Sequence, residues 1–307
     1  MKGRKDVATV PLPAMPEIRP GQSVELLQEL HILTRDARMN QDSRRKLKQV
    51  YHLYQFIEPL LQAVRQEHPD LTLVDHGAGK SYLGFILYDL FFKDLDGQPH
   101  IYGIETRAEL VAKSQALAAR LGFANMSFLN LTVAQSIVSE QLPERVDLVT
   151  ALHACNTATD DAIRFALAKQ ARHIVLVPCC QAEVAATLRK NKGQAIRREA
   201  LSELWRHPIH TREFGSHVTN VLRCLQLEAH GYQVTVTELV GWEHSMKNEL
   251  IIASRKGPPQ KRQAERLNAM LALLGLEELS GRFFTPDAAP DPGGELDARS
   301  GDGPSAG

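Results

Sequence analysis

The sequence predicts an α/β protein built on a doubly wound sheet of seven strands, mostly parallel, with an antiparallel hairpin at its C-terminal end. Beyond Leu71, short apolar runs alternate with segments of helical periodicity, which is the pattern of strand–helix units. Only GWEHSMKN separates the last two apolar runs. That connection is too short for a crossover helix, so these two strands are expected to pair antiparallel.

The strands are expected at seven apolar runs, in order LTLVDH, HIYGIE, MSFLN, VDLVTAL, HIVLVPC, YQVTVTELV and ELIIASR. Helices between the first five are expected at residues 81–92, 108–121, 133–140 and 160–169. Beyond the fifth strand, we expect helical stretches at 181–204 and 216–230 around a loop holding RHPIHTREFG, and a last helix at 259–274. The alternation predicts a Rossmann-like arrangement with helices on both faces of the sheet.

The sheet is expected to occupy one part of a longer chain. Residues 1–22 are rich in proline and are expected to be irregular, and residues 23–68 form a helical extension in which Pro59 is expected to bend or split the helix. Residues 69–256 form the predicted sheet domain, and residues 257–280 the C-terminal helix. The tail, 281–307, is rich in Pro, Gly, Asp and Ser and is expected to be disordered.

The composition is that of an ordinary globular protein. Of the 307 residues, 43% are hydrophobic and 23% charged, and 36 basic residues balance 36 acidic ones. Overall charge therefore gives no argument for a polyanionic partner. No apolar run approaches the ~18 residues of a membrane span. The four cysteines include an adjacent pair and follow no secreted-domain spacing, so we expect reduced thiols and a cytoplasmic, membrane-free protein.

The stretch LVDHGAGKS raises two alternatives. A phosphate-binding P-loop, G-x-x-x-x-G-K-[ST], would end at Gly79-Lys80-Ser81 and would need its first glycine at Val74. A valine inside a strand cannot begin that loop. The remaining pattern is D-x-G-x-G after a strand and before a helix, where glycines allow a sharp turn and a ligand close to the backbone.

Polar residues follow the ends of the next strands as well. Asp75, Gly77 and Gly79 form the glycine turn after the first strand, and Glu105 ends the second, where a carboxylate can accept the ribose hydroxyls of a nucleoside. Asn130 ends the third strand, where it can reach an adenine edge. The alternatives are a helix N-terminal charge for Glu105 and a turn former for Asn130. With Leu152 of the fourth strand, the set predicts an S-adenosylmethionine site.

A second group of residues follows the fourth and fifth strands, which are neighbours in this topology. We expect His153, Cys155, Cys179 and Cys180 to lie together beside the cofactor, with Asp160 nearby. His153 and Asp160 are the candidate bases, and a cysteine methyl carrier is an alternative. The cysteines can equally be small buried residues. A zinc site from these side chains is conceivable, but without C-x-x-C spacing no metal is expected.

These motifs resemble one methyltransferase family. D-H-G-A-G-K, L-H-A-C-N-T-A-T-D and the Cys179-Cys180 pair are similar to motifs of the class I S-adenosylmethionine-dependent family that includes the tRNA 2′-O-ribose methyltransferases and proteins labelled as ribosomal RNA adenine dimethylase domain-containing. KLKQVYHLYQFIE and GWEHSMKNELIIASR resemble segments of its bacterial relatives, and the likeness covers residues 40–255. It implies a methyltransferase that contacts its substrate through Lys46, Gln49, His244, Lys247 and Asn248.

The chain departs from that family at several positions. Ser81 replaces the glycine after the lysine, the leading lysine of the second motif is missing, and no paired histidines follow Cys180. The zinc-finger modules of the tRNA enzymes are absent from the sequence.

Two basic segments, RRKLK at 44–48 and the loop 206–212, favour RNA, either tRNA or rRNA, as the acceptor. No N-P-P-Y motif follows the fourth strand, which disfavours adenine N6 chemistry. The alternatives are a ribosomal or translation protein as acceptor, a small molecule, or a non-catalytic module that binds cofactor or RNA.

Overall fold

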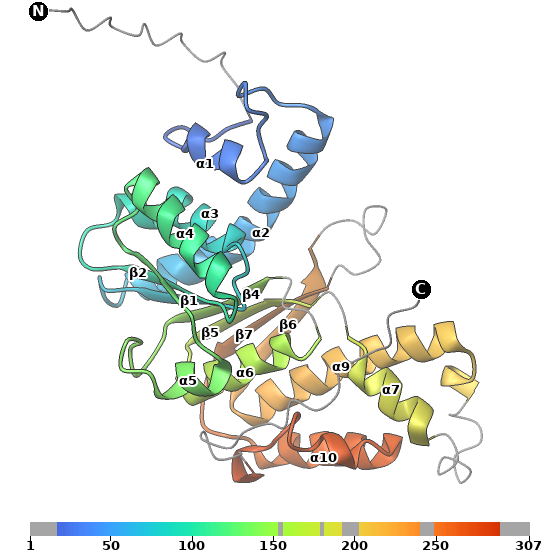
Figure 1. Cartoon of the computed structure of the whole chain (residues 1–307). Helices are drawn as coiled ribbons and strands as arrows, with labels where there is room; N and C mark the ends of the chain where they lie inside the picture. The colour runs from blue at the N-terminus through green and yellow to red at the C-terminus, as the bar shows by residue number, and fades with distance from the viewer. Residues whose placement is uncertain (1–16, 153–155, 179–180, 192–202, 240–248, 289–307) are drawn as a thin grey trace, which may run out of the picture.

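A seven-stranded sheet in the order β3-β2-β1-β4-β5-β7-β6 forms the centre of the molecule (Figure 1). The computed structural model describes residues 17–152, 156–178, 181–191, 203–239 and 249–288. The strands are β1 (Thr72–His76), β2 (His100–Ile104), β3 (Met126–Leu129), β4 (Leu148–Leu152), β5 (His173–Val177), β6 (Tyr232–Glu238) and β7 (Glu249–Arg255).

The pairing of the strands confirms the predicted fold class. β1 to β5 are parallel, and β7 runs antiparallel to both β5 and β6. Val74 lies in the middle of β1, opposite Tyr102 of β2 and Val149 of β4, and it is fully buried. A residue in that position cannot line a phosphate loop, so the structure agrees with the exclusion of the P-loop.

Helices cover both faces of the sheet (Figure 1). The helices are α1 (Val24–Glu29), α2 (Gln41–Arg65), α3 (Tyr82–Leu90), α4 (Ala108–Leu121), α5 (Val133–Val138), α6 (Ala158–Ala168), α7 (Glu183–Lys190), α9 (Pro208–Ala229) and α10 (Lys261–Leu274). One apolar core joins α1 to α4 to one face, and a second joins α6 and α9 to the other. The arrangement is therefore doubly wound, with apolar side chains of successive strand residues buried on opposite faces.

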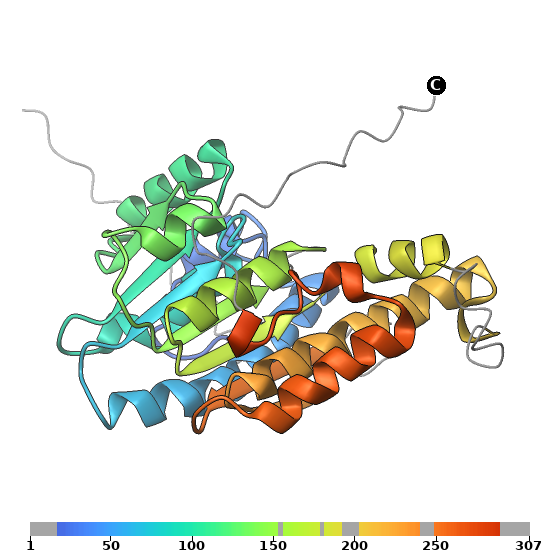
Figure 2. The same cartoon turned by 90° about the horizontal axis from the view of Figure 1, so that it is seen from below.

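A third apolar cluster lies outside the sheet. It joins α7, α9 and α10 through residues such as Leu188, Leu222 and Leu267. Figure 2 shows α9 and α10 side by side on one face of the sheet, with α7 beyond them. Among the described helices, none is both long and apolar enough to span a lipid bilayer.

The N-terminal helices differ from their predictions in length. α2 continues through Pro59 without a break, and Asn40 caps its start, where the Asn40 side chain accepts a hydrogen bond from the Ser43 backbone at 2.8 Å. α1 covers only six residues of the helical extension that was expected at residues 23–68. His31 and Ala37 take left-handed φ angles of 54° and 53°, which end the helix and fold the segment back.

The structure of the segment RHPIHTREFG differs from its prediction. It was expected to be a loop, but α9 begins inside it at Pro208 and runs without interruption to Ala229. Proline is well suited to the first turn of a helix, where its missing N–H has no partner to lose. The helix expected at 181–204 is represented, within the described residues, by α7 and the 3-10 turn Glu203–Trp205.

The beginning of the tail is packed on the protein. Phe283 and Phe284 are 1% and 5% exposed, and Phe283 joins the cluster between α9 and α10. A 3-10 turn follows at Pro286–Ala288. Residues 281–288 are therefore ordered, where the sequence predicted disorder to begin at residue 281.

Candidate functional site

The glycine turn after β1 is shaped by three left-handed residues. Gly77, Gly79 and Ser81 have φ angles of 67°, 59° and 47°. Glycine adopts such angles without the penalty of a Cβ, whereas a serine needs support from its surroundings. The Ser81 hydroxyl donates to Asp75 at 3.1 Å, and this hydrogen bond supports the serine in its left-handed conformation.

The Asp75 side chain, near the end of β1, connects this turn to the sheet. Its side chain is 2% exposed, and its oxygens accept hydrogen bonds from Ser81 and, at 3.0 Å, from Thr150 of β4. Burial raises the pKa of Asp75 to about 6, against the opposing effect of these hydrogen bonds. The carboxylate therefore fixes the turn on the sheet and has little surface left for a ligand.

Glu105 faces the same turn from the end of β2. One of its oxygens accepts from the Gly79 backbone N–H at 2.8 Å, and the other accepts from the Arg107 backbone N–H at 3.0 Å. Burial acts to raise the pKa of Glu105, but the hydrogen bonds from Arg107 and Gly79 outweigh it and lower the pKa to about 2. Glu105 is thus a fixed, ionised acceptor beside the glycine turn.

The Arg107 side chain covers that carboxylate. Its Nε and Nη2 atoms donate to Glu105 at 3.0 and 3.1 Å, and its side chain is 60% exposed. A Cβ placed on Gly79 would lie 3.8 Å from Arg107 Nη2, so the guanidinium lies over the turn. A ligand whose hydroxyls bind Glu105 has to replace these two hydrogen bonds. No sequence pattern pointed to Arg107.

The remaining predicted cofactor residues lie at the same edge. Asn130 is exposed after β3, and its Nδ2 donates to the Glu105 backbone carbonyl at 2.9 Å, while its side-chain oxygen has no hydrogen-bond partner among the described residues. Leu152 is half-buried at the end of β4, in register with Val177. The ends of β3, β2, β1 and β4 are consecutive in the sheet, so the structure brings all the predicted cofactor positions to one edge.

His76 is an additional feature of this edge that the sequence analysis did not single out. The side chain is 6% exposed, and neither ring nitrogen has a hydrogen-bond partner within the part of the chain that the structure describes. Its ring packs on Phe165 of α6, with 5.2 Å between centroids. Burial lowers the pKa of His76 to about 4, against the opposing charge of Glu105. The imidazole is therefore neutral and packed between the sheet and α6.

The predicted catalytic group is described only in part. His153, Cys155, Cys179 and Cys180 lie outside the described residues, and so do His244, Lys247 and Asn248 of the predicted substrate set. Asp160 is described, and its position corrects the prediction that it is a candidate base. Both of its oxygens accept from Arg223 of α9, at 2.7 and 2.8 Å, with the two side chains 4% and 1% exposed. A buried carboxylate held on both oxygens by a guanidinium is not available to accept a proton from a substrate.

Arg223 belongs to a buried polar network that reaches three strand ends. Its Nη2 donates to the Asn156 carbonyl at 3.0 Å, and its Nη1 donates to Asn220 at 3.1 Å. Asn220 also accepts from Gln181 at 2.7 Å and donates to Glu249 at 2.6 Å. Asn156, Gln181 and Glu249 stand directly after segments 153–155, 179–180 and 240–248. One network on α9 therefore anchors the chain where each of these segments ends.

Lys46 and Gln49 of the predicted substrate set lie on α2. Lys46 forms an ion pair with Asp42 at 2.9 Å, one helical turn away, and it lines a cavity of about 680 Å³ beside α1. Gln49 is half-buried on the same helix. Exposed pairs of this kind contribute little to stability, so Lys46 can exchange its partner for a ligand at small cost.

The comparisons with known proteins bear on the part of the chain that holds the candidate site. Residues 45–187 match a family model described as "Methyltransferase domain". No curated protein matches the sequence. The family match includes the glycine turn, Glu105 and the residues that follow β4, so it covers the edge at which the candidate site lies.

Several solved structures are similar to the chain. An rRNA methylase from Streptococcus thermophilus is 10% identical, with 62% of this chain and 89% of that one covered and a TM-score of 0.38. A magnesium protoporphyrin IX methyltransferase from Synechocystis PCC 6803, with bound SAH, is 15% identical over 76% and 93%, with a TM-score of 0.40. A putative caffeoyl-CoA O-methyltransferase from Staphylococcus aureus is 9% identical over 76% and 92%, with a TM-score of 0.42.

These likenesses are too distant to carry an argument about what the chain acts on. The family match and the observed strand order bear on its enzyme class. They agree with the predicted methyltransferase, while neither of them distinguishes a tRNA or rRNA enzyme from other methyltransferases. The match over residues 45–187 and the observed strand order therefore agree with the predicted enzyme class, for which S-adenosylmethionine is the expected cofactor.

Proposed function

We propose that the protein transfers a methyl group to an RNA, either tRNA or rRNA. The main support for cofactor binding in this proposal is the hydrogen bond from the Gly79 backbone N–H to the Glu105 carboxylate. It fixes an ionised acceptor beside a glycine turn, at the carboxyl edge where a doubly wound sheet binds its ligands. Gly77 and Gly79 would lie against the methionine end of S-adenosylmethionine, and Glu105 would accept its ribose hydroxyls.

The donor site is suited to a neutral nucleoside. Glu105 stays ionised through the physiological range because its pKa is lowered to about 2, so it accepts hydrogen bonds and donates none. Asn130, whose amide is oriented by the Glu105 carbonyl, would present its oxygen to an adenine edge. Asp75 would act through the turn and not by contact with the cofactor, since Ser81 and Thr150 bind its oxygens.

S-adenosylmethionine supplies a methyl group on a positively charged sulfur, which leaves as a neutral thioether when an acceptor atom attacks in line. The chain has to align the acceptor and remove one proton. Among the two predicted bases, Asp160 is bound by Arg223, so the role falls to His153, directly after Leu152. The Arg223 network would support this residue by holding Asn156, where segment 153–155 ends.

Exposed basic side chains support RNA as the acceptor. Arg44, Arg45 and Lys48 are exposed on α2, and Arg206 and Arg212 lie near the N-terminal end of α9. Cations arranged on a surface supply the salt-dependent part of nucleic-acid affinity. The net charge of zero means that this attraction is local and confined to such patches.

The proposal is tested by incubating the purified protein with radiolabelled S-adenosylmethionine and three fractions from cells that lack it: total tRNA, rRNA and ribosomal protein. We expect label in one RNA fraction, with the modified nucleoside identified by mass spectrometry. Gly77→Arg should abolish the labelling. Label in a protein fraction and in no RNA would overturn RNA as the acceptor and leave the enzyme class intact.

A further inference from the structure

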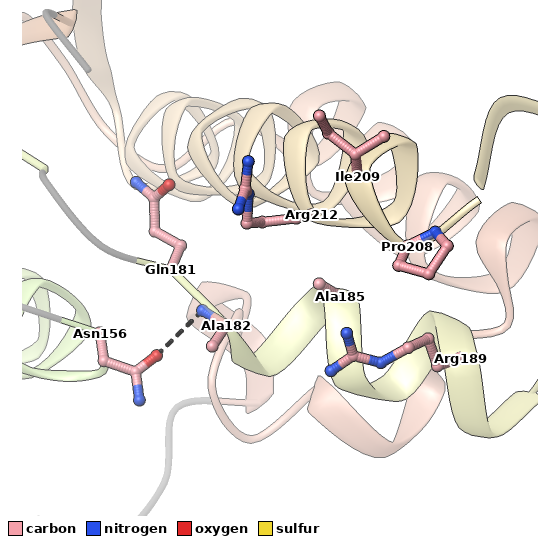
Figure 3. A pocket seen from close by; sticks show the side chains of 8 residues that line it. All are labelled: Asn156, Gln181, Ala182, Ala185, Arg189, Pro208, Ile209 and Arg212. Carbon is pink, nitrogen blue, oxygen red and sulfur yellow. Dashed lines mark hydrogen bonds between the residues drawn. The ribbon is translucent and has the colours of Figure 1, made fainter. Parts of the chain in front are cut away.

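We propose that the groove between α7 and α9 binds a phosphate group of the acceptor strand through Arg189 and Arg212. This inference rests on the proposed function, and it assigns the acceptor a place on the protein. The groove has a volume of about 670 Å³ and lies between the two helices (Figure 3). Its sides are formed by Ala185 and Arg189 of α7, with Ala182 just before that helix, and by Pro208, Ile209 and Arg212 of α9.

The two helices are locked together at one side of the groove. A Cβ placed on Gly215 of α9 would lie 2.7 Å from the Ala185 Cβ, so only glycine allows this approach. Beneath them, Val184 and Leu188 of α7 pack with Val218 and Leu222 of α9 in one apolar cluster. The groove is therefore a preformed feature of two packed helices, and binding in it requires no rearrangement of their contact.

The charges on the walls select an anion. Arg189 is exposed, and its guanidinium has no carboxylate partner among the described residues. Arg212 donates to Glu213 at 2.9 Å, but both side chains are largely exposed, at 60% and 46%, so this pair is weak. Among the described residues that line the groove, none carries a carboxylate. Two guanidinium groups on facing walls match a phosphate, which they can bind through paired N–H···O hydrogen bonds.

The groove also reaches toward the carboxyl ends of β4 and β5, which the predicted catalytic residues follow in the sequence. One end is formed by Asn156 and Gln181, the residues that follow segments 153–155 and 179–180 (Figure 3). Asn156 Oδ1 accepts from the Ala182 backbone at 3.2 Å, while its Nδ2 has no partner among the described residues. A strand whose phosphate lies between Arg189 and Arg212 would thus bring a neighbouring nucleotide toward the ends of β4 and β5.

Apolar surface lies beside the charges. Ile209 is 59% exposed, and Pro208 lines the groove next to it. Such surface suits the ribose or base of a nucleotide and is costly to expose to water without a ligand. The combination of guanidinium groups, a free amide donor and exposed apolar side chains fits a nucleotide segment better than a free anion.

The test measures binding of a fluorescein-labelled, single-stranded RNA of 12 nucleotides by anisotropy over a range of salt concentrations. We expect Arg189→Gln with Arg212→Gln to weaken binding about tenfold and to make the salt dependence shallower by about 0.7, since the two side chains share one phosphate and each phosphate neutralised on a single strand contributes about 0.7. Calorimetry should give an unchanged affinity for S-adenosylmethionine in the same double variant.

Lys113→Gln with Arg262→Gln is the matched control, because it removes the same charge from exposed positions on α4 and α10. An equal loss of RNA affinity in the control would overturn the proposed phosphate site in the groove. Unchanged RNA binding together with an unchanged KM for RNA in the Arg189→Gln, Arg212→Gln variant would overturn it as well. Failure of the proposed function has a different signature. The wild-type protein would then methylate no RNA while labelling a protein, and the groove proposal would fall with it.

Discussion

Arg223 binds both carboxylate oxygens of Asp160 inside the protein, with Nε–Oδ1 and Nη2–Oδ2 distances of 2.7 and 2.8 Å. The pair joins the middle of α9 to the beginning of α6. Because the same guanidinium also holds the Asn156 carbonyl, it ties α9 to the chain that follows β4. The pair therefore links α9, which lines the groove between α7 and α9, to the chain after β4, where the predicted base His153 is found in the sequence.

Removing the arginine alone should be costly. Arg223→Met leaves Asp160 as a buried charge without a partner, and we expect a loss of about 3–5 kcal/mol in the free energy of unfolding. Asp160→Asn added to Arg223→Met should recover part of this loss, because it removes the stranded charge. Urea denaturation of the three proteins measures the difference. A loss below about 1 kcal/mol in Arg223→Met would contradict the buried pair.

The glycine turn and Glu105 should be needed for cofactor binding. We expect Gly77→Arg and Glu105→Ala each to weaken S-adenosylmethionine binding at least tenfold, because one fills the turn and the other removes the acceptor for the ribose hydroxyls. Isothermal titration calorimetry measures the change. Glu109→Ala, an exposed carboxylate on α4, is the control and should bind normally. Normal binding in both site variants would reject the pocket.

Arg107 should compete with the cofactor for Glu105. Two hydrogen bonds from its guanidinium have to be released before ribose hydroxyls can replace them. A hydrogen bond to a charged group contributes about 1.5–3 kcal/mol. Exposure of the Arg107 side chain to solvent reduces this contribution. We therefore expect Arg107→Ala to tighten S-adenosylmethionine binding by about three- to tenfold in calorimetry. Weaker binding would mean instead that Arg107 contacts the cofactor.

His76 should make the protein sensitive to acid. Its folded pKa of about 4 lies below the ordinary value of 6.5, so the unfolded chain takes up the proton first. The stability due to the neutral ring is present above pH 6.5 and is lost as the pH falls toward 4. With about 1.4 kcal/mol for each pKa unit, the loss reaches about 3 kcal/mol.

The test of His76 is a difference between two proteins. His76→Leu should lose less stability than the wild type between pH 7 and pH 4.5, measured by urea denaturation at each pH. The comparison removes the contribution of other histidines, such as His173, whose pKa is also lowered to about 4. A stability difference that does not change with pH would show that His76 is not buried in its neutral form.

The sheet could be predicted because its signal is local. β5 is buried at every position, and the helix expected at 108–121 matches α4 at both ends. The glycine turn was equally visible, since φ angles above zero leave a residue preference in the sequence. The start of α9 was misread because Pro208 was taken as a loop residue, when a proline can open a helix as well as end one.

Residues of the candidate site could be predicted only where a local sequence motif marks them. Glu105 was singled out because it ends a strand. The role of Asp160 was missed because its partner, Arg223, is 63 residues away in the chain and no local pattern marks their contact. The same reason hid Arg107 and the groove between α7 and α9, since side-chain direction and helix packing decide both.

The position of β7 has a consequence for how the protein is made. β7 fills the place between β5 and β6, and His173 pairs with Ser254, 81 residues later in the chain. During synthesis, β5 therefore leaves the ribosome with one edge unpaired and waits for nearly all of the remaining domain before that edge is closed. Such an edge can recruit strands of other nascent chains. Slow synthesis beyond residue 177, or a chain cut short before Glu249, is expected to give aggregation of the newly made protein.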